Sequence, residues 1–208
     1  MQIVTLKVIA TVRWRRKSKA MESDSFYIID FETTGLSPTN GDRVIEVAAL
    51  KIVSNKIVDQ YQSLMNPGFE ISNRITNITG ISNDMLDDAP SNSKVIGSLV
   101  EFLEDNALVA HNASFDSNFL KNELLKTKIK RSYQFTCSMR LARRVFPKAP
   151  NHKLGTLLQY RGISHSDLLH RALADVNATY KLWIDMNKTL AAKRGKREIS
   201  FLEMRDYI

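Results

Sequence analysis

Two carboxylates, Asp30 and Glu32, stand two residues apart at the end of an apolar stretch that is typical of a buried β-strand. Because side chains alternate across a strand, both carboxylates are expected on the same face of it. Two negative charges held side by side favour a bound cation, since each raises the free energy of the other. This pair is therefore the first candidate for a metal-binding site.

Two later segments carry groups of the same kind. Residues 108–116 run from an apolar stretch into a polar turn and place Asp116 at the start of a predicted helix. Residues 170–175 begin another predicted helix, with His170 at one end and Asp175 at the other. Each acid lies just past the end of a strand or at the start of a helix. We therefore expect four acids and one histidine to converge on one patch.

The types of these side chains indicate a hard divalent cation. Carboxylate oxygens suit Mg²⁺ or Mn²⁺, whereas a zinc site would combine His with Cys, and the chain has only one cysteine, Cys137. Two such ions about 3.5 to 4 Å apart stabilise the attacking and leaving oxygens of a phosphodiester during in-line displacement. A histidine, with an ordinary pKa of about 6.5, can deprotonate the attacking water near neutral pH.

In this order and at these spacings, the three segments resemble the three exonuclease motifs of the DEDDh family, typified by the proofreading epsilon subunit of bacterial DNA polymerase III. Residues 75–81 also resemble the family segment that precedes its second motif. The spacing of His170 and Asp175 is that of the histidine branch of the superfamily, and the match runs from about Phe26 to Asn187. The resemblance implies an α/β, RNase H-like exonuclease fold: a mixed five-stranded sheet with helices on both sides.

The resemblance also implies a role for each motif residue. Asp30 bridges two Mg²⁺ or Mn²⁺ ions, Glu32 and Asp175 complete the site that holds the nucleophilic water, Asp116 serves the second ion, and His170 is the general base. The residues expected to bind the terminal nucleotide or to hold its site together are Thr34, Leu36, His111, Asn112 and Phe115.

Other roles stay open for several of these residues. Leu36 and Phe115 could instead belong to the core, and Thr34 could simply support a turn. His165 lies five residues before His170 but lacks an acid at the family's spacing, so we expect it in a loop.

The expected activity is 3′-to-5′ hydrolysis of DNA ends, single-stranded or frayed, with release of nucleoside 5′-monophosphates, in proofreading or repair. A DNA polymerase is the corresponding candidate partner. Two alternatives stay open. One is an RNA 3′-to-5′ exonuclease of the same superfamily, ribonuclease T-like or oligoribonuclease-like, because the metal chemistry is identical and only contacts to the 2′-OH discriminate. The other is a non-catalytic nucleic-acid-binding adaptor. The presence of all five catalytic residues argues against this alternative, because an adaptor would usually have lost at least one of them.

The elements that must position these residues follow from hydrophobic periodicity. Three strand-like stretches separated by turn signals predict an antiparallel meander over residues 26–31, 43–52 and 56–65. A helical period with Val95, Leu99, Phe102 and Leu103 on one face precedes a short strand over residues 108–110. Further helices are predicted over residues 115–126, 138–145, 153–160 and 172–187. Strands first and alternating elements later predict a mixed α/β sheet.

The formal net charge of +8 over 208 residues is concentrated at the two ends. Residues 1–24 hold six Lys or Arg and two acids, or +4, and residues 188–208 hold six and three, or +3, which leaves +1 for the middle. We therefore predict a basic N-terminal extension over 1–24, an exonuclease domain over 25–187 and a basic C-terminal tail over 188–208. One domain suits a chain of this length.

The chain shows no sign of export or of membrane insertion. A single cysteine allows no intramolecular disulfide, and no apolar run approaches the roughly 20 residues of a membrane helix; the stretch 44–50, for example, is interrupted by Glu46. The apolar stretch 3–12 precedes a basic cluster, the reverse of the order in a secretory signal. We expect a cytoplasmic protein.

Overall fold

The computed structural model describes residues 24–164 and 170–208, and its centre is a mixed five-stranded sheet. The strands are β1 (Ser25–Thr33), β2 (Val44–Val53), β3 (Lys56–Leu64), β4 (Ala107–Ala110) and β5 (Phe135–Cys137), in the order β3-β2-β1-β4-β5. β1, β2 and β3 form the predicted antiparallel meander, and β4 and β5 extend the sheet parallel to β1. The predicted mixed sheet is confirmed.

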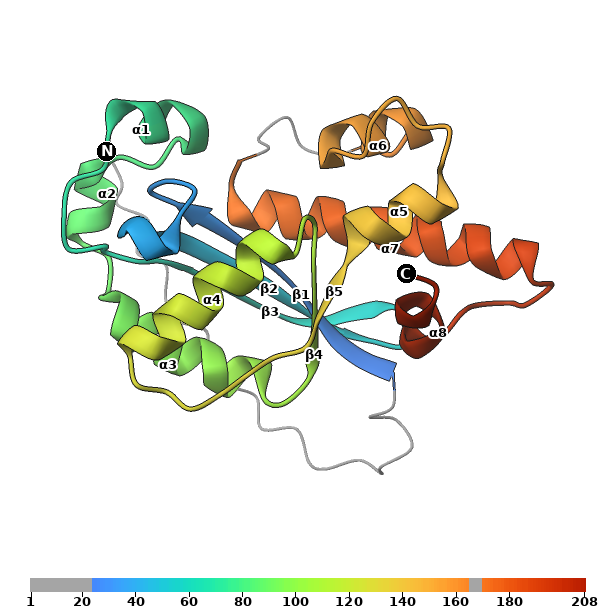
Figure 1. Ribbon diagram of the computed structural model, residues 1–208, viewed down its shortest axis with the longest axis horizontal. Helices are drawn as coiled ribbons and strands as arrows, with labels where there is room; N and C mark the ends of the chain where they lie inside the picture. Colours follow the sequence, from blue (N-terminus) through green and yellow to red (C-terminus); the bar gives the residue numbers. More distant parts are fainter. Residues whose placement is uncertain (1–23, 165–169) are drawn as a thin grey trace.

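Helices cover both faces of this sheet (Figure 1). In chain order they are α1 (Asn73–Thr79), α2 (Asn83–Asp87), α3 (Asn92–Leu103), α4 (Ser114–Lys126), α5 (Ser138–Val145), α6 (Leu154–Arg161), α7 (Ala172–Lys193) and α8 (Phe201–Asp206), with a short 3₁₀ turn at Pro38–Asn40. Phe26 and Ile28 of β1 join the core formed with α5, α6, α7 and α8, whereas Tyr27 and Ile29 join the core formed with α3 and α4. The predicted two-sided arrangement of helices is therefore present.

The central position of β1 explains its sequence and prepares the site. Four consecutive apolar residues, 26–29, are all buried because helices cover the strand on both faces. The pairing of β1 with β2 shifts register between Glu32 and Thr33, a local irregularity that changes the direction of the chain at the end of the strand. Since β1 and β4 are parallel, the loops that follow them leave the sheet at the same edge.

The structure corrects the predicted C-terminal tail. The boundary expected at residue 187 falls inside α7, which continues to Lys193, and α8 follows it. Phe201 stacks on Phe26 of β1 with ring centroids 4.7 Å apart, and Met204 is fully buried. The basic residues of this segment lie around an apolar stripe, so residues 188–208 complete the core instead of forming a separate tail. Residues 1–23 of the predicted N-terminal extension, which spans residues 1–24, lie outside the described residues.

Four short elements were absent from the sequence prediction: α1, α2, β5 and α8. Each has three to seven residues, which is too short for hydrophobic periodicity to stand out. Within the described ranges, no helix is both long and apolar enough to cross a membrane.

Candidate active site

Three of the predicted acids meet at one edge of the sheet. Carboxylate oxygens of Asp30, Glu32 and Asp175 all lie within 4.8 Å of one another. Asp30 and Glu32 follow Ile28 at two-residue steps on β1, so they continue on the face that packs against α7. Asp175 comes from the first turn of α7. This convergence, expected from the alternation of the strand and the start of the helix, is therefore present.

The fourth acid, Asp116, is buried beside this cluster. It lies in the first turn of α4, only 2% exposed, and its Oδ1 atom has no hydrogen-bond partner among residues 24–164 and 170–208. The negative charge of Asp116 raises the pKa of Asp30, so the two carboxylates interact electrostatically. A buried carboxylate oxygen without a donor is unfavourable, and a bound cation would satisfy it.

The electrostatics of the cluster also favour a bound cation. Burial raises the pKa of Asp30 well above its usual range, and repulsion from Asp116, Asp175 and Glu32 raises it further. Burial and repulsion from Asp175 and Glu46 raise the pKa of Glu32 to about 8, and burial raises that of Asp116 to about 7. Asp30, Glu32 and Asp116 thus resist ionisation, and together with Asp175 they form an all-oxygen donor set, which fits Mg²⁺ or Mn²⁺.

These pKa shifts predict how stability and metal binding depend on pH. Glu32 has an ordinary pKa of 4.5 and a folded-state pKa of about 8, so between these values the folded protein binds protons that the unfolded chain has released. The melting temperature of EDTA-treated protein should therefore fall as pH rises from about 5 to about 8. Added Mn²⁺ must displace those protons, so its stabilising effect should grow over the same range. Thermal melts with and without Mn²⁺ measure both trends; an Mn²⁺ effect that is equal at every pH would contradict them.

A fifth carboxylate, Glu46, anchors the third motif. It is fully buried on β2, opposite Glu32, and accepts hydrogen bonds from Arg171 Nε (3.1 Å) and Nη2 (2.9 Å), from Gln62 Nε2 (3.0 Å) and from the Ala172 amide (3.0 Å). Burial opposes ionisation of Glu46, but these hydrogen bonds outweigh it and lower its pKa. The Glu46–Arg171 ion pair, together with the Ala172 amide, ties the start of α7 to the sheet and so fixes where the third motif begins.

The sequence prediction assigned no role to Glu46 or Arg171. Glu46 was noted only as an interruption of an apolar stretch, which is itself a usable signal, since an acid inside a buried strand needs a partner.

His170 lies directly before this anchor. Its backbone is in the left-handed region, with φ 75°, and its amide donates to Asp175 Oδ2 at 3.0 Å. The side chain is exposed, and its ring makes no hydrogen bond to another described residue. His165, the alternative weighed from the sequence, lies outside the described residues. The assignment of His170 as the base therefore stays a prediction.

The loop after β1 presents Leu36 to solvent. Asp42 accepts hydrogen bonds from the Thr34 hydroxyl (3.3 Å) and the Ser37 amide (2.9 Å), and the Thr34 hydroxyl accepts from the Arg43 amide (3.0 Å). A Cβ atom on Gly35 would lie 2.4 Å from the Asp42 carboxylate, so a larger residue would displace this carboxylate from its hydrogen bonds with Thr34 and Ser37. Leu36 is 85% exposed at the tip of the loop, which excludes the core position considered for it. The Thr34 hydroxyl, by contrast, forms hydrogen bonds within the loop.

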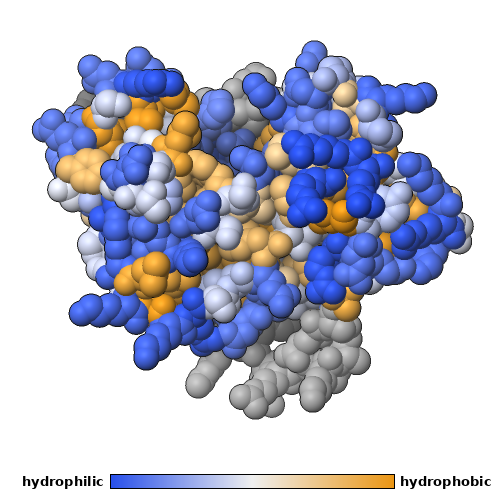
Figure 2. Space-filling model, in the orientation of Figure 1, coloured by the Kyte–Doolittle hydropathy of each residue, from blue (hydrophilic) through white to orange (hydrophobic). Residues whose placement is uncertain are grey.

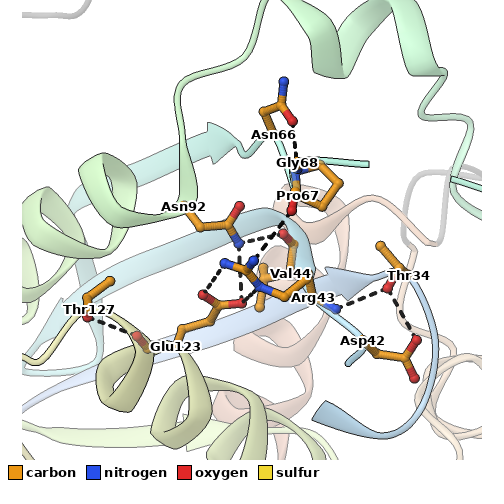
Figure 3. Close-up of polar contacts among 10 residues, drawn as sticks. All are labelled: Thr34, Asp42, Arg43, Val44, Asn66, Pro67, Gly68, Asn92, Glu123 and Thr127. Atoms are coloured by element: carbon orange, nitrogen blue, oxygen red, sulfur yellow. Dashed lines mark hydrogen bonds and ion pairs between the residues drawn. The ribbon is translucent and has the colours of Figure 1, made fainter. Parts of the chain in front are cut away.

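A buried ion pair connects this loop to α3 and α4 (Figure 3). Arg43 donates from Nε to Glu123 Oε1 (2.7 Å) and from Nη2 to Oε2 (3.0 Å), and Glu123 is 1% exposed. Asn92 donates to Glu123 Oε1 (3.3 Å) and to the Val44 carbonyl (3.0 Å). The base of the Leu36 loop is therefore held from two helices.

Removal of one partner of this pair should be costly. Glu123→Ala leaves the half-buried Arg43 guanidinium and the buried Asn92 amide without their shared carboxylate, and we expect a loss of about 1–3 kcal/mol in the free energy of unfolding. Asp105→Ala is the matched control, since it removes the 80%-exposed partner of Arg131, and such surface pairs contribute about 0–1 kcal/mol. Urea denaturation of both variants measures the difference; equal losses would show that the buried pair contributes no more than the exposed one.

His111 of the second motif is engaged within the protein. The carbonyl of His152 can only accept, so the His111 ring donates to it from Nε2 (2.9 Å) and accepts from the Ser138 hydroxyl at Nδ1 (2.9 Å). Burial lowers the pKa of His111 to about 4, which keeps the ring neutral. Both ring nitrogens of His111 thus have partners within the protein.

The other two predicted residues of the second motif differ in burial. Asn112 is exposed with φ 71°, and Phe115 is half-buried against Phe119.

Comparison with known proteins agrees with this geometry. The family model described as "Exonuclease" matches residues 27–183. The DNA polymerase III PolC-type protein of Caldanaerobacter subterraneus subsp. tengcongensis is 38% identical over 176 residues, which cover 84% of this chain and 12% of that protein. This chain therefore spans about an eighth of that relative's length.

Solved structures give the same result. Exonuclease X in complex with 5′ overhanging duplex DNA is 28% identical with a TM-score of 0.67, over 88% of this chain and 98% of that one. The nuclease domain of 3′hExo, a DEDDh family member bound to rAMP, is 20% identical with a TM-score of 0.69, over 86% and 96%, and shares the fold. By its sequence motifs, its sheet and the family match over most of its length, the chain belongs to the exonuclease family.

Proposed function

We propose that this chain is a metal-dependent 3′-to-5′ exonuclease that hydrolyses phosphodiester bonds at DNA 3′ ends and releases nucleoside 5′-monophosphates. The observation that carries the proposal is the convergence of Asp30, Glu32 and Asp175 beside the unpartnered carboxylate oxygen of Asp116. DNA is favoured over RNA because the relative is named a DNA polymerase and the exonuclease X structure holds DNA. By the same reasoning, a DNA polymerase is the proposed partner and proofreading or repair the proposed role.

The four acids would hold two Mg²⁺ or Mn²⁺ ions, which when bound would stabilise the charge on the attacking and leaving oxygens of the phosphodiester. His170 accepts the proton of the attacking water from its exposed position at the start of α7. The Glu46–Arg171 pair keeps that start in place, so the base meets the water at a fixed position. Leu36 and Phe115 contact the base and sugar of the terminal nucleotide by apolar packing, which tolerates any base.

Digestion of a 5′-labelled single-stranded DNA oligonucleotide and of its RNA counterpart tests this proposal. With Mg²⁺ we expect a ladder that shortens from the 3′ end, forms faster on DNA and disappears with EDTA. Faster cleavage of RNA would assign the chain to the RNA-processing members of the superfamily. Cleavage of neither substrate would favour the non-catalytic adaptor.

A further inference from the structure

Helix α5 has one apolar and one basic face. Its buried residues, Ser138, Leu141, Ala142 and Val145, face the core that contains α7. Arg140, Arg143 and Arg144 follow the complementary three- and four-residue spacing and are all exposed. The loop after the helix adds exposed Lys148 and Lys153. We call these five residues the α5 surface.

The positive charge of the α5 surface is not neutralised. The sequence has no Asp or Glu between Glu123 and Asp167. In the part of the chain that the structure describes, none of the five residues forms an ion pair, whereas Arg161 on α6 pairs with Asp185 and Arg171 with Glu46. Figure 2, drawn in the orientation of Figure 1, shows strongly hydrophilic surface over α5. The α5 surface therefore keeps its charge available for a polyanion.

The second motif fixes this surface next to the acidic cluster. The Nδ1 atom of His111 contacts the hydroxyl of Ser138, the first residue of α5. Its Nε2 atom contacts the carbonyl of His152, the residue directly before Lys153. His152 in turn lies within hydrogen-bond distance of the Phe146 carbonyl at the end of α5. The charge of Arg143 also contributes to the lowered pKa of His111, after burial and His152. Both parts of the α5 surface are thus anchored to the segment that carries Asp116.

We propose that the α5 surface binds the phosphate groups of the substrate strand upstream of the terminal nucleotide. This inference rests on the proposed function: a site that takes one nucleotide at a 3′ end leaves the remaining phosphates to run over the neighbouring surface. Clustered Arg and Lys without acidic partners bind such a backbone without reading its sequence, by release of counterions. The surface would set the affinity for long strands and leave the chemical step unchanged.

The test replaces Arg140, Arg143 and Arg144 together by glutamine. The KM for an oligonucleotide of about 20 nucleotides should rise roughly tenfold or more, and the slope of log KM against log salt should fall by about 2, since each single-strand phosphate contact contributes about 0.7. The kcat should stay within about twofold. Turnover of the 4-nitrophenyl ester of thymidine 5′-monophosphate, which carries no upstream phosphates, should be unchanged.

The matched control, Lys56→Gln, Lys94→Gln and Lys126→Gln, removes the same charge from exposed positions on β3, α3 and α4. An equal rise in KM for this control, or an unchanged salt slope for the arginine variant, would overturn the proposal. So would a variant that keeps its oligonucleotide KM but loses binding to polyglutamate, because the surface would then suit an acidic protein. A wild-type protein that hydrolyses neither substrate would refute the proposed function itself.

Discussion

Asp30→Ala is expected to abolish turnover in a protein that remains folded. Asp30 is the acid on which Asp116, Asp175 and Glu32 all act, so it is central to the carboxylate cluster. In the proposed mechanism, the remaining acids could not hold the metal pair that would stabilise the attacking and leaving oxygens. That stabilisation contributes several kcal/mol, so we expect kcat to fall by about 10⁴-fold or more.

The fold should survive this substitution because the Asp30 carboxylate is itself unfavourable in the metal-free protein. Burial and three neighbouring acids oppose its ionisation, so its removal relieves repulsion. Oligonucleotide hydrolysis at saturating Mg²⁺, a thermal melt and Mn²⁺ titration measure the three consequences. Asp59→Ala, at an exposed position on β3, is the control and should keep full activity. A near-normal rate for Asp30→Ala would refute the metal assignment.

His170→Ala should slow hydrolysis by about 10² to 10⁴-fold, the usual contribution of a general base. Mn²⁺ affinity should change little, because the four carboxylates stay in place and the Asp175 oxygen is held by the backbone amide of residue 170, which alanine retains. Single-turnover rates and Mn²⁺ titrations of the wild type and the variant measure the two effects.

Two further variants make the His170 result specific. His165→Ala should keep normal turnover; if it caused the loss instead, His165 would be the base. Arg171→Ala removes the partner of buried Glu46 and should disturb the start of α7, so it should weaken Mn²⁺ binding as well as the rate. If His170→Ala weakened Mn²⁺ binding as much as Arg171→Ala does, the role of His170 would be structural only.

The sequence by itself determined the longer elements and the acids that they deliver. β1, β2, β3 and the longer helices follow from periodicity, which is a local property of the chain. The alternation that puts Asp30 and Glu32 on one face of β1, and the helix start that carries Asp175, are local as well. Even the overlooked α8 has a local signal, the capping box formed by Ser200 and Glu203.

Only the tertiary structure decided which charges are buried and with what partner. Glu46 and Arg171 are 125 residues apart in the chain, and Arg43 and Glu123 are 80 apart. A salt bridge has no periodicity, so its partners are known only once the sheet and helices have packed. The same holds for the C-terminal segment, whose net charge suggested a tail. The burial of Phe201 against Phe26 outweighs that charge, because a stacked aromatic side chain leaves water while the neighbouring lysines and arginines stay in it.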